Sequence, residues 1–175
     1  MRFHSITLLA LVAPAVLALA GCATPAGPAA TAALQPTSGN RASGTVRFAQ
    51  HGPVVRVTGE VRGLKPNAEH GFHVHEKGDC TSADGMSAGG HFNPGGTPHG
   101  RPGMGPHHAG DLPSLKADAS GVAKFDFESG ALRIGDGAAN IVGRGLIVHR
   151  DPDDYASQPA GNAGPRLACA VIRNA

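Results

Sequence analysis

The sequence predicts an all-β domain, a sandwich or barrel of short strands, preceded by an N-terminal export segment. Several short segments alternate apolar and polar residues with a period of two, which is the pattern of half-buried strands. Glycine and proline are abundant, at 26 and 14 of 175 residues, and no segment has the pattern of an amphipathic helix. This composition fits either disorder or an all-β domain with many turns and long ordered loops. The alternation favours the all-β domain.

The expected strands are short and are separated by turn residues. In the clearest one, residues 54–61, three valines fall on one face and charged or polar residues fall on the other. A Gln-His-Gly-Pro link at residues 50–53 predicts a hairpin turn before it. In the last strand, Leu167, Cys169 and Val171 share a face. The full set of expected strands covers residues 44–50, 54–61, 71–75, 122–128, 140–149 and 166–172.

Two long segments, residues 77–113 and 150–165, lack strand character. Long loops without secondary structure are uncommon in compact domains and are usually functional. These two loops hold or border most of the histidine, aspartate and arginine residues that could bind a metal or take part in catalysis. We therefore expect the functional site to be built from them.

The N-terminal residues 1–21 have the layout of a secretory signal peptide. Arg2 gives a positive start, and residues 6–20 form an apolar run of about 15 residues, short of the about 20 that a membrane-spanning helix needs. Residues 19–22, Leu-Ala-Gly-Cys, resemble a bacterial lipobox, in which Cys22 becomes the lipidated first residue. Ala23 after it points to the outer membrane. These features predict a lipid-anchored protein of the bacterial cell envelope that faces the periplasm; the alternative is an ordinary signal peptide with a cysteine near its cut.

Residues 22–40 are expected to form the lipidated Cys22 and a flexible linker, because they are rich in Ala, Pro, Thr and Gly and poor in large apolar residues. The domain then spans residues 41–175. The chain has three cysteines. If Cys22 carries lipid, Cys80 and Cys169 remain as a pair, and an oxidising compartment would let them form a disulfide.

The charge balance and the hydropathy exclude some classes of partner. The formal net charge of +2 is too small to indicate a nucleic-acid partner. After the first 21 residues, no stretch of sequence is long and apolar enough to span a membrane. The lipid anchor is therefore the expected attachment to the membrane.

The histidines carry the strongest chemical signal. His73 and His75 are two apart on an expected strand, so their imidazoles face one point, as two metal ligands would. Surface histidines without a ligand are the alternative for this pair alone. Four more histidines and an aspartate follow within the first long loop, and imidazole with one carboxylate suits zinc or copper. A flexible Gly/Pro/His-rich loop with loose metal affinity remains the alternative there. These loop residues are His91, His99, His107, His108 and Asp111.

Four motifs in this order resemble the signatures of the copper/zinc superoxide dismutase family. They are Gly-Phe-His-Val-His-Glu at 71–76, Gly-His-Phe-Asn-Pro at 90–94, Gly-Asp-Leu at 110–112 and Gly-Asn-Ala-Gly-Pro-Arg-Leu-Ala-Cys at 161–169. The resemblance covers about residues 41–174. It implies a Greek-key β-barrel or sandwich of about eight antiparallel strands with two long functional loops.

The resemblance also implies two metal sites, with one copper and one zinc per subunit, that share His91. His107 is excluded, because the family pattern His-x-Gly-Asp-Leu selects its neighbour. The implied copper ligands are His73, His75, His91 and His149, and the implied zinc ligands are His91, His99, His108 and Asp111.

Three further roles follow from the resemblance. Asp153 would hydrogen-bond one ligand of each metal, His73 and His99, and so fix the angle of each ring. Arg166 would be the active-site arginine that attracts and docks the anionic substrate. His91 would be catalytic as the imidazolate between the metals.

The implied activity converts superoxide to dioxygen and hydrogen peroxide by Cu(II)/Cu(I) cycling, and zinc has no redox role. In the envelope this activity would protect the cell from superoxide. A homodimer is among the assemblies that the family offers. The main alternative is a non-enzymatic copper- or zinc-binding envelope lipoprotein on the same fold. A zinc hydrolase would need an open coordination position, and the implied zinc ligands fill four.

Overall fold

The computed structural model describes Met1 and residues 27–175, and these residues contain ten strands and one 3-10 turn. Residues 2–21 of the predicted signal peptide and Cys22 lie outside these described residues. Among the described residues, no helix has the length and apolar character needed to cross a membrane. The elements are β1 Ala29–Pro36, β2 Ser43–His51, β3 Val54–Arg62, β4 Glu69–His70, β5 Phe72–His75, η1 Met86–Ala88, β6 Leu115–Lys116, β7 Ala123–Ser129, β8 Gly145–His149, β9 Arg166–Val171 and β10 Arg173–Asn174.

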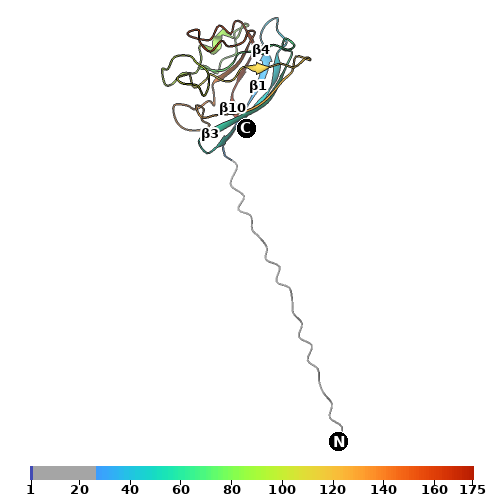
Figure 1. The fold of residues 1–175 in the computed structure, drawn as a ribbon, viewed down its shortest axis with the longest axis vertical. Helices are drawn as coiled ribbons and strands as arrows, with labels where there is room; N and C mark the ends of the chain where they lie inside the picture. The colour runs from blue at the N-terminus through green and yellow to red at the C-terminus, as the bar shows by residue number, and fades with distance from the viewer. Residues whose placement is uncertain (2–26) are drawn as a thin grey trace.

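Eight of the ten described strands form one curled antiparallel sheet, which Figure 1 shows. Its order is β5-β8-β9-β1-β2-β3-β7, with β10 paired to β1, and β4 and β6 form a separate two-stranded sheet. The hairpin between β2 and β3 is where the sequence predicts it. The long connections from β5 to β6 and from β8 to β9 contain the two predicted loops. The predicted all-β fold of about eight antiparallel strands is confirmed.

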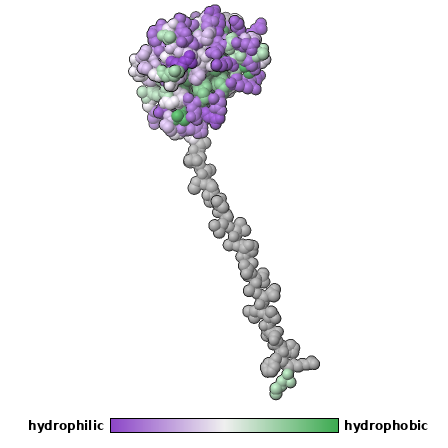
Figure 2. Space-filling model, viewed as in Figure 1, coloured by the Kyte–Doolittle hydropathy of each residue, from purple (hydrophilic) through white to green (hydrophobic). Residues whose placement is uncertain are grey.

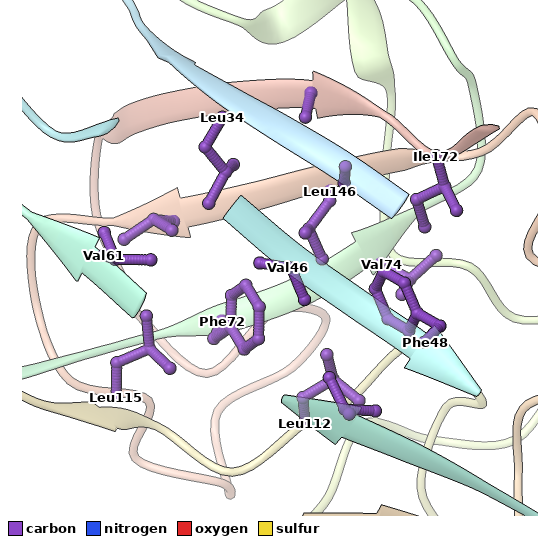
Figure 3. Close-up of a cluster of buried hydrophobic side chains, with 14 of the residues drawn as sticks. Leu34, Val46, Phe48, Val61, Phe72, Val74, Leu112, Leu115, Leu146 and Ile172 are labelled. Carbon is purple, nitrogen blue, oxygen red and sulfur yellow. The ribbon is translucent and has the colours of Figure 1, made fainter. Parts of the chain in front are cut away.

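The core fills the inside of the curled sheet. Figure 3 shows apolar side chains from several strands that point toward one another. On β2 and β3 the buried residues alternate with exposed or half-buried ones, as period two requires. The labelled core residues are Leu34, Val46, Phe48, Val61, Phe72, Val74, Leu112, Leu115, Leu146 and Ile172.

The prediction of a flexible linker over residues 22–40 is wrong for residues 29–36, which form β1. This strand pairs with β2 on one side and with β9 and β10 on the other, so it lies inside the sheet. Its inward residues Ala30, Ala32 and Leu34 are buried. The composition was misleading because a central strand that packs small side chains needs few large apolar residues.

Two details of the strand predictions also change. The strand expected over residues 140–149 begins only at Gly145, because a turn at Gly143, with φ of 82°, precedes it. On β9 the core side consists of Ala168 and Ala170, whereas Cys169 points to the opposite face. That outer face is covered by a loop, so the strand is buried on both sides and its alternation does not reveal the core side.

The surface of the domain is mainly hydrophilic on the face shown in Figure 2, with small hydrophobic areas between. Among the described residues, the exposed large hydrophobic side chains are Met1, Met86 and Met104. The apolar side chains are therefore concentrated inside the sheet and beneath the loops.

The position of β1 leads to a first prediction, on truncated chains. Deletion of residues 1–26 leaves every described strand and should preserve a cooperative thermal transition. Deletion of residues 1–36 also removes β1, which leaves the edges of β2 and β9 unpaired, and should abolish that transition. Circular dichroism melting of both variants checks this. Equal melting temperatures for the two deletions would contradict the role of β1.

Candidate metal centre

Strand β5 divides its four residues between two buried environments. Phe72 and Val74 point into the core, so His73 and His75 project from the outer face of the sheet. The neighbouring β8 follows the same rule, with Leu146 and Val148 in the core, and it ends at His149. The structure thus brings three histidines from two paired strands to one outer face.

The first long loop folds back over this face and is pinned to β5 by backbone hydrogen bonds. The Val74 N–H donates to the Gly110 carbonyl (2.9 Å), and the Phe92 N–H donates to the Val74 carbonyl (2.8 Å). A Cβ on Gly110 would overlap the Val74 carbonyl oxygen, so this approach requires glycine. The contact places His91 and Asp111, the neighbours of Phe92 and Gly110, opposite β5.

Two ring nitrogens in the first histidine group face each other without a proton between them. The Nδ1–H of His75 donates to the Gly89 carbonyl (2.9 Å), and the Nδ1–H of His149 donates to the Gly164 carbonyl (3.1 Å). Their Nε2 atoms, which then carry lone pairs, lie 3.4 Å apart. His73 Nδ1 and His91 Nε2 are buried and lack a hydrogen-bond partner. Such a convergence of lone pairs fits a cation.

The second group converges on one carboxylate oxygen. Asp111 Oδ1 lies 2.8 Å from His91 Nδ1, 3.1 Å from His99 Nδ1 and 3.2 Å from His108 Nδ1. Zinc ligands at about 2.0–2.1 Å in a tetrahedron are about 3.3 Å apart, so these spacings fit a zinc ion. His91 offers Nδ1 to this group and Nε2 to the first, which makes it the residue common to both.

Burial sets the protonation of these ligands. It lowers the pKa of the His149 imidazole to about 4, and it holds the pKa values of His73 and His75 well below the ordinary range. It also lowers the pKa of His108. Burial opposes ionisation of Asp111, but hydrogen bonds from His91 and from backbone amides outweigh it and lower that pKa. These shifts favour the forms that bind metals, neutral imidazoles and a carboxylate, at His73, His75, His108, His149 and Asp111.

Comparison with known proteins agrees with the geometry of two adjacent groups of candidate metal ligands. The family model "Copper/zinc superoxide dismutase" matches residues 42–172. The chain belongs to the copper/zinc superoxide dismutase family. The superoxide dismutase [Cu-Zn] of Paramecium bursaria Chlorella virus 1 is 47% identical over 136 residues, 74% of this chain and 71% of the relative. That of Yarrowia lipolytica is 46% identical over 142 residues, 76% of this chain and 90% of the relative.

Membership of the family identifies the chain as an oxidoreductase that acts on superoxide, with copper and zinc as cofactors. In each group the candidate ligand atoms lie within 4.8 Å of one another. His107 belongs to neither group, and its Nδ1–H donates to the His108 carbonyl. The groups contain the residues named from the sequence: His73, His75, His91 and His149 in one, and His91, His99, His108 and Asp111 in the other.

Asp153 lies between the two groups, where the sequence places it. Its Oδ2 accepts from His73 Nε2 (2.7 Å) and its Oδ1 accepts from His99 Nε2 (2.9 Å), with all three side chains fully buried. These bonds fix the tautomers, so that the Nδ1 atom of each ring is the free one. A Cβ on Gly161 would overlap the Asp153 carboxylate, which explains a glycine there.

Arg166 lies at the edge of the first group and is half buried. Its guanidinium donates to the carbonyls of Gly85 (2.7 Å) and Gly89 (2.6 Å). The Gly89 carbonyl also accepts from His75, so one oxygen holds both the arginine and a residue of the first group. Burial lowers the pKa of Arg166, but a guanidinium stays charged at neutral pH. A fixed positive charge therefore lies beside the first group, where it acts on His75 and His149.

The predicted disulfide between Cys80 and Cys169 is formed, with Cα atoms 5.8 Å apart. It ties the first loop to β9, three residues from Arg166. Around it, Ala88 and Ile147 complete a small apolar cluster on the outer face of the sheet. The bond thus anchors the loop segment whose carbonyls hold the arginine.

Sequence reasoning missed several residues that support the ligands. His70 is buried, and its Nδ1–H donates to the His149 carbonyl (2.9 Å). The Gln158 side-chain amide forms two hydrogen bonds with the His99 backbone. It accepts from the His99 N–H and donates to the His99 carbonyl, both at 2.9 Å. Neither residue belongs to a repeating pattern or a short motif that could have revealed these contacts.

Proposed function

We propose that the first group binds copper and the second binds zinc, in a superoxide dismutase that is anchored by lipid in the bacterial cell envelope and protects it from superoxide. The orientation of the ring nitrogens carries the metal assignment. In each group the lone pairs point inward, while the opposite ring nitrogen of His73, His75, His99 and His149 is taken by a carbonyl or by Asp153.

The protein supplies fixed geometry and fixed charge to this centre. Copper, when bound, provides one-electron redox chemistry, and zinc provides positive charge and structure. His91 contributes one nitrogen to each group and so sets the spacing between the two metals. Arg166 binds the superoxide anion beside the copper group, held in place by the carbonyls of Gly85 and Gly89. We assign catalytic roles to His91 and Arg166 on these grounds.

The envelope location rests on residues 1–22. The charged start, the apolar run and the Leu-Ala-Gly-Cys sequence at 19–22 support cleavage before Cys22 and lipidation of its thiol. The disulfide between Cys80 and Cys169 fits an oxidising compartment such as the periplasm. We place the protein in the outer membrane, because Ala23 follows the cysteine.

The metal assignment predicts a selective loss of copper. The purified protein should hold one copper and one zinc per chain. His149→Ala should lose copper and dismutase activity but keep zinc, because this histidine contacts only the first group. Elemental analysis with a superoxide decay assay checks this. His107→Ala is the matched control and should keep both metals; loss of zinc from it would contradict the choice of His108.

The role of Arg166 predicts a change in the salt dependence of the rate. Arg166→Gln should lower kcat/KM about tenfold at low ionic strength and flatten its decrease with added salt, with metal content unchanged. Stopped-flow decay of superoxide at several salt concentrations measures this. Arg56→Gln, which removes a charge paired with Asp126 on β3 and β7, is the control. Equal salt dependence in wild type and Arg166→Gln would refute anion guidance.

The lipid anchor predicts how the protein fractionates in a Gram-negative host. Wild type should sediment with outer membranes and show a lipid mass on its N-terminal peptide. Cys22→Ser should appear in the soluble periplasmic fraction with unchanged metal content. Ala23→Ser, the adjacent control, should stay with the membrane. A wild-type N-terminus without lipid, recovered from the soluble fraction, would rule out the anchor.

A further inference from the structure

Tyr155 connects the carboxylate between the two metal groups to a second loop segment. Its backbone N–H donates to Asp153 Oδ1 (2.7 Å), the oxygen that also accepts from His99. Its hydroxyl accepts from the Ser114 N–H (2.8 Å) and donates to Ser114 Oγ (3.1 Å). Ser114 follows the zinc-group ligand Asp111 by three residues. One tyrosine thus joins the loop of residues 150–165 to the segment that carries Asp111.

These contacts close a ring around Asp153. The Ser114 hydroxyl that meets Tyr155 also accepts from the Asp153 backbone N–H (3.4 Å). Asp153 is therefore held at its backbone through Ser114 and at its carboxylate through Tyr155. The Asp153 carboxylate can fix the angles of His73 and His99 only if it is itself fixed. Among the described residues, no Lys or Arg forms an ion pair with this carboxylate, so other contacts must hold it.

The conformation of Tyr155 shows that this arrangement is imposed by its surroundings. The residue has φ of 57°, in the left-handed region that bulky side chains rarely adopt. The guanidinium carbon of Arg101 lies 3.9 Å from the centre of the tyrosine ring, and Arg101 follows His99 by two residues. The ring therefore contacts a third loop segment, the one that carries a zinc-group ligand.

We propose that Tyr155 is a positioning residue for the metal centre, and that its hydroxyl, through Ser114, holds Asp153 in the orientation that fixes His73 and His99. The inference rests on the proposed zinc site, because zinc retention is its main consequence. Removal of a direct outer partner of a metal ligand costs about 10- to 100-fold in metal affinity. Tyr155 acts one step further out, so we expect a smaller loss, about three- to tenfold in zinc affinity.

A double-mutant cycle on zinc binding tests the route through Asp153. The zinc dissociation constant is measured by chelator competition for wild type, Tyr155→Phe, Asp153→Asn and the double variant. Tyr155→Phe keeps the ring and its contact with Arg101 but removes the hydroxyl. It should weaken zinc about three- to tenfold in the wild-type background and less than about twofold in Asp153→Asn, where the group it positions is already lost. Ser120→Ala, which removes an exposed hydroxyl bonded to Asp118, is the control.

Each outcome separates the inference from the function on which it rests. If wild type binds no zinc, the proposed metal site fails. If wild type binds zinc and the effects of Tyr155→Phe and Asp153→Asn are additive, or Tyr155→Phe has no effect, only the role of Tyr155 is overturned. The visible spectrum of cobalt bound in the zinc site gives a second readout, and its bands should shift in Tyr155→Phe but not in Ser120→Ala.

Ser114→Ala provides the same test should Tyr155→Phe fail to fold. It removes the hydroxyl between Tyr155 and Asp153 and keeps every aromatic contact, so it should weaken zinc by a similar factor. Tyr155 is the only tyrosine in a chain without tryptophan, so its fluorescence reports on this site alone. Zinc removal should change that fluorescence in wild type. Zinc affinity equal to that of wild type in Ser114→Ala would overturn the proposal.

Discussion

The whole centre depends on the two faces of β5. All four residues of this strand are buried, two in the apolar core and two in the candidate metal centre. A shift of one residue against β8 would move His73 and His75 into the core and would direct Phe72 and Val74 toward the metals. Burying unpaired imidazoles in an apolar core is costly, so such a shift is opposed from both sides. The register of β5 against β8 therefore also determines the position of the metal centre.

The loops over this face are ordered mainly by polar contacts. The first loop contributes few large apolar side chains to the core, chiefly Phe92 and Leu112. It is held instead by backbone bonds to β5, by the disulfide and by the Asp111 carboxylate, on which three imidazoles converge. Metal ligation adds to this network at its most buried points. Loss of metal should therefore loosen the loops more than the sheet, whose core consists mainly of strand residues.

The sequence predicts those features that neighbouring residues carry, and it does not predict contacts between segments that are far apart along the chain. The ligands could be named because they occur in short motifs, and β2 and β3 could be placed because their two faces differ in polarity. β1 was missed because its buried alanines are also typical of linkers. The supports of the centre were missed for another reason: Tyr155 meets Ser114 across 41 residues and Gln158 meets His99 across 59. Such contacts exist only once the sheet has brought the two loops together.

The position of β1 also limits how far the domain can lie from the proposed anchor. β1 begins at Ala29, and the Gln50 N–H already donates to the Pro28 carbonyl (2.8 Å). At about 3.5 Å per residue, the chain from Cys22 to Pro28 spans at most about 20 Å. At its other end, β1 leads to Thr37, whose hydroxyl donates to the Arg166 carbonyl (2.7 Å). A lipid on Cys22 would therefore hold the domain close to the membrane through the same strand that borders the arginine of the active site.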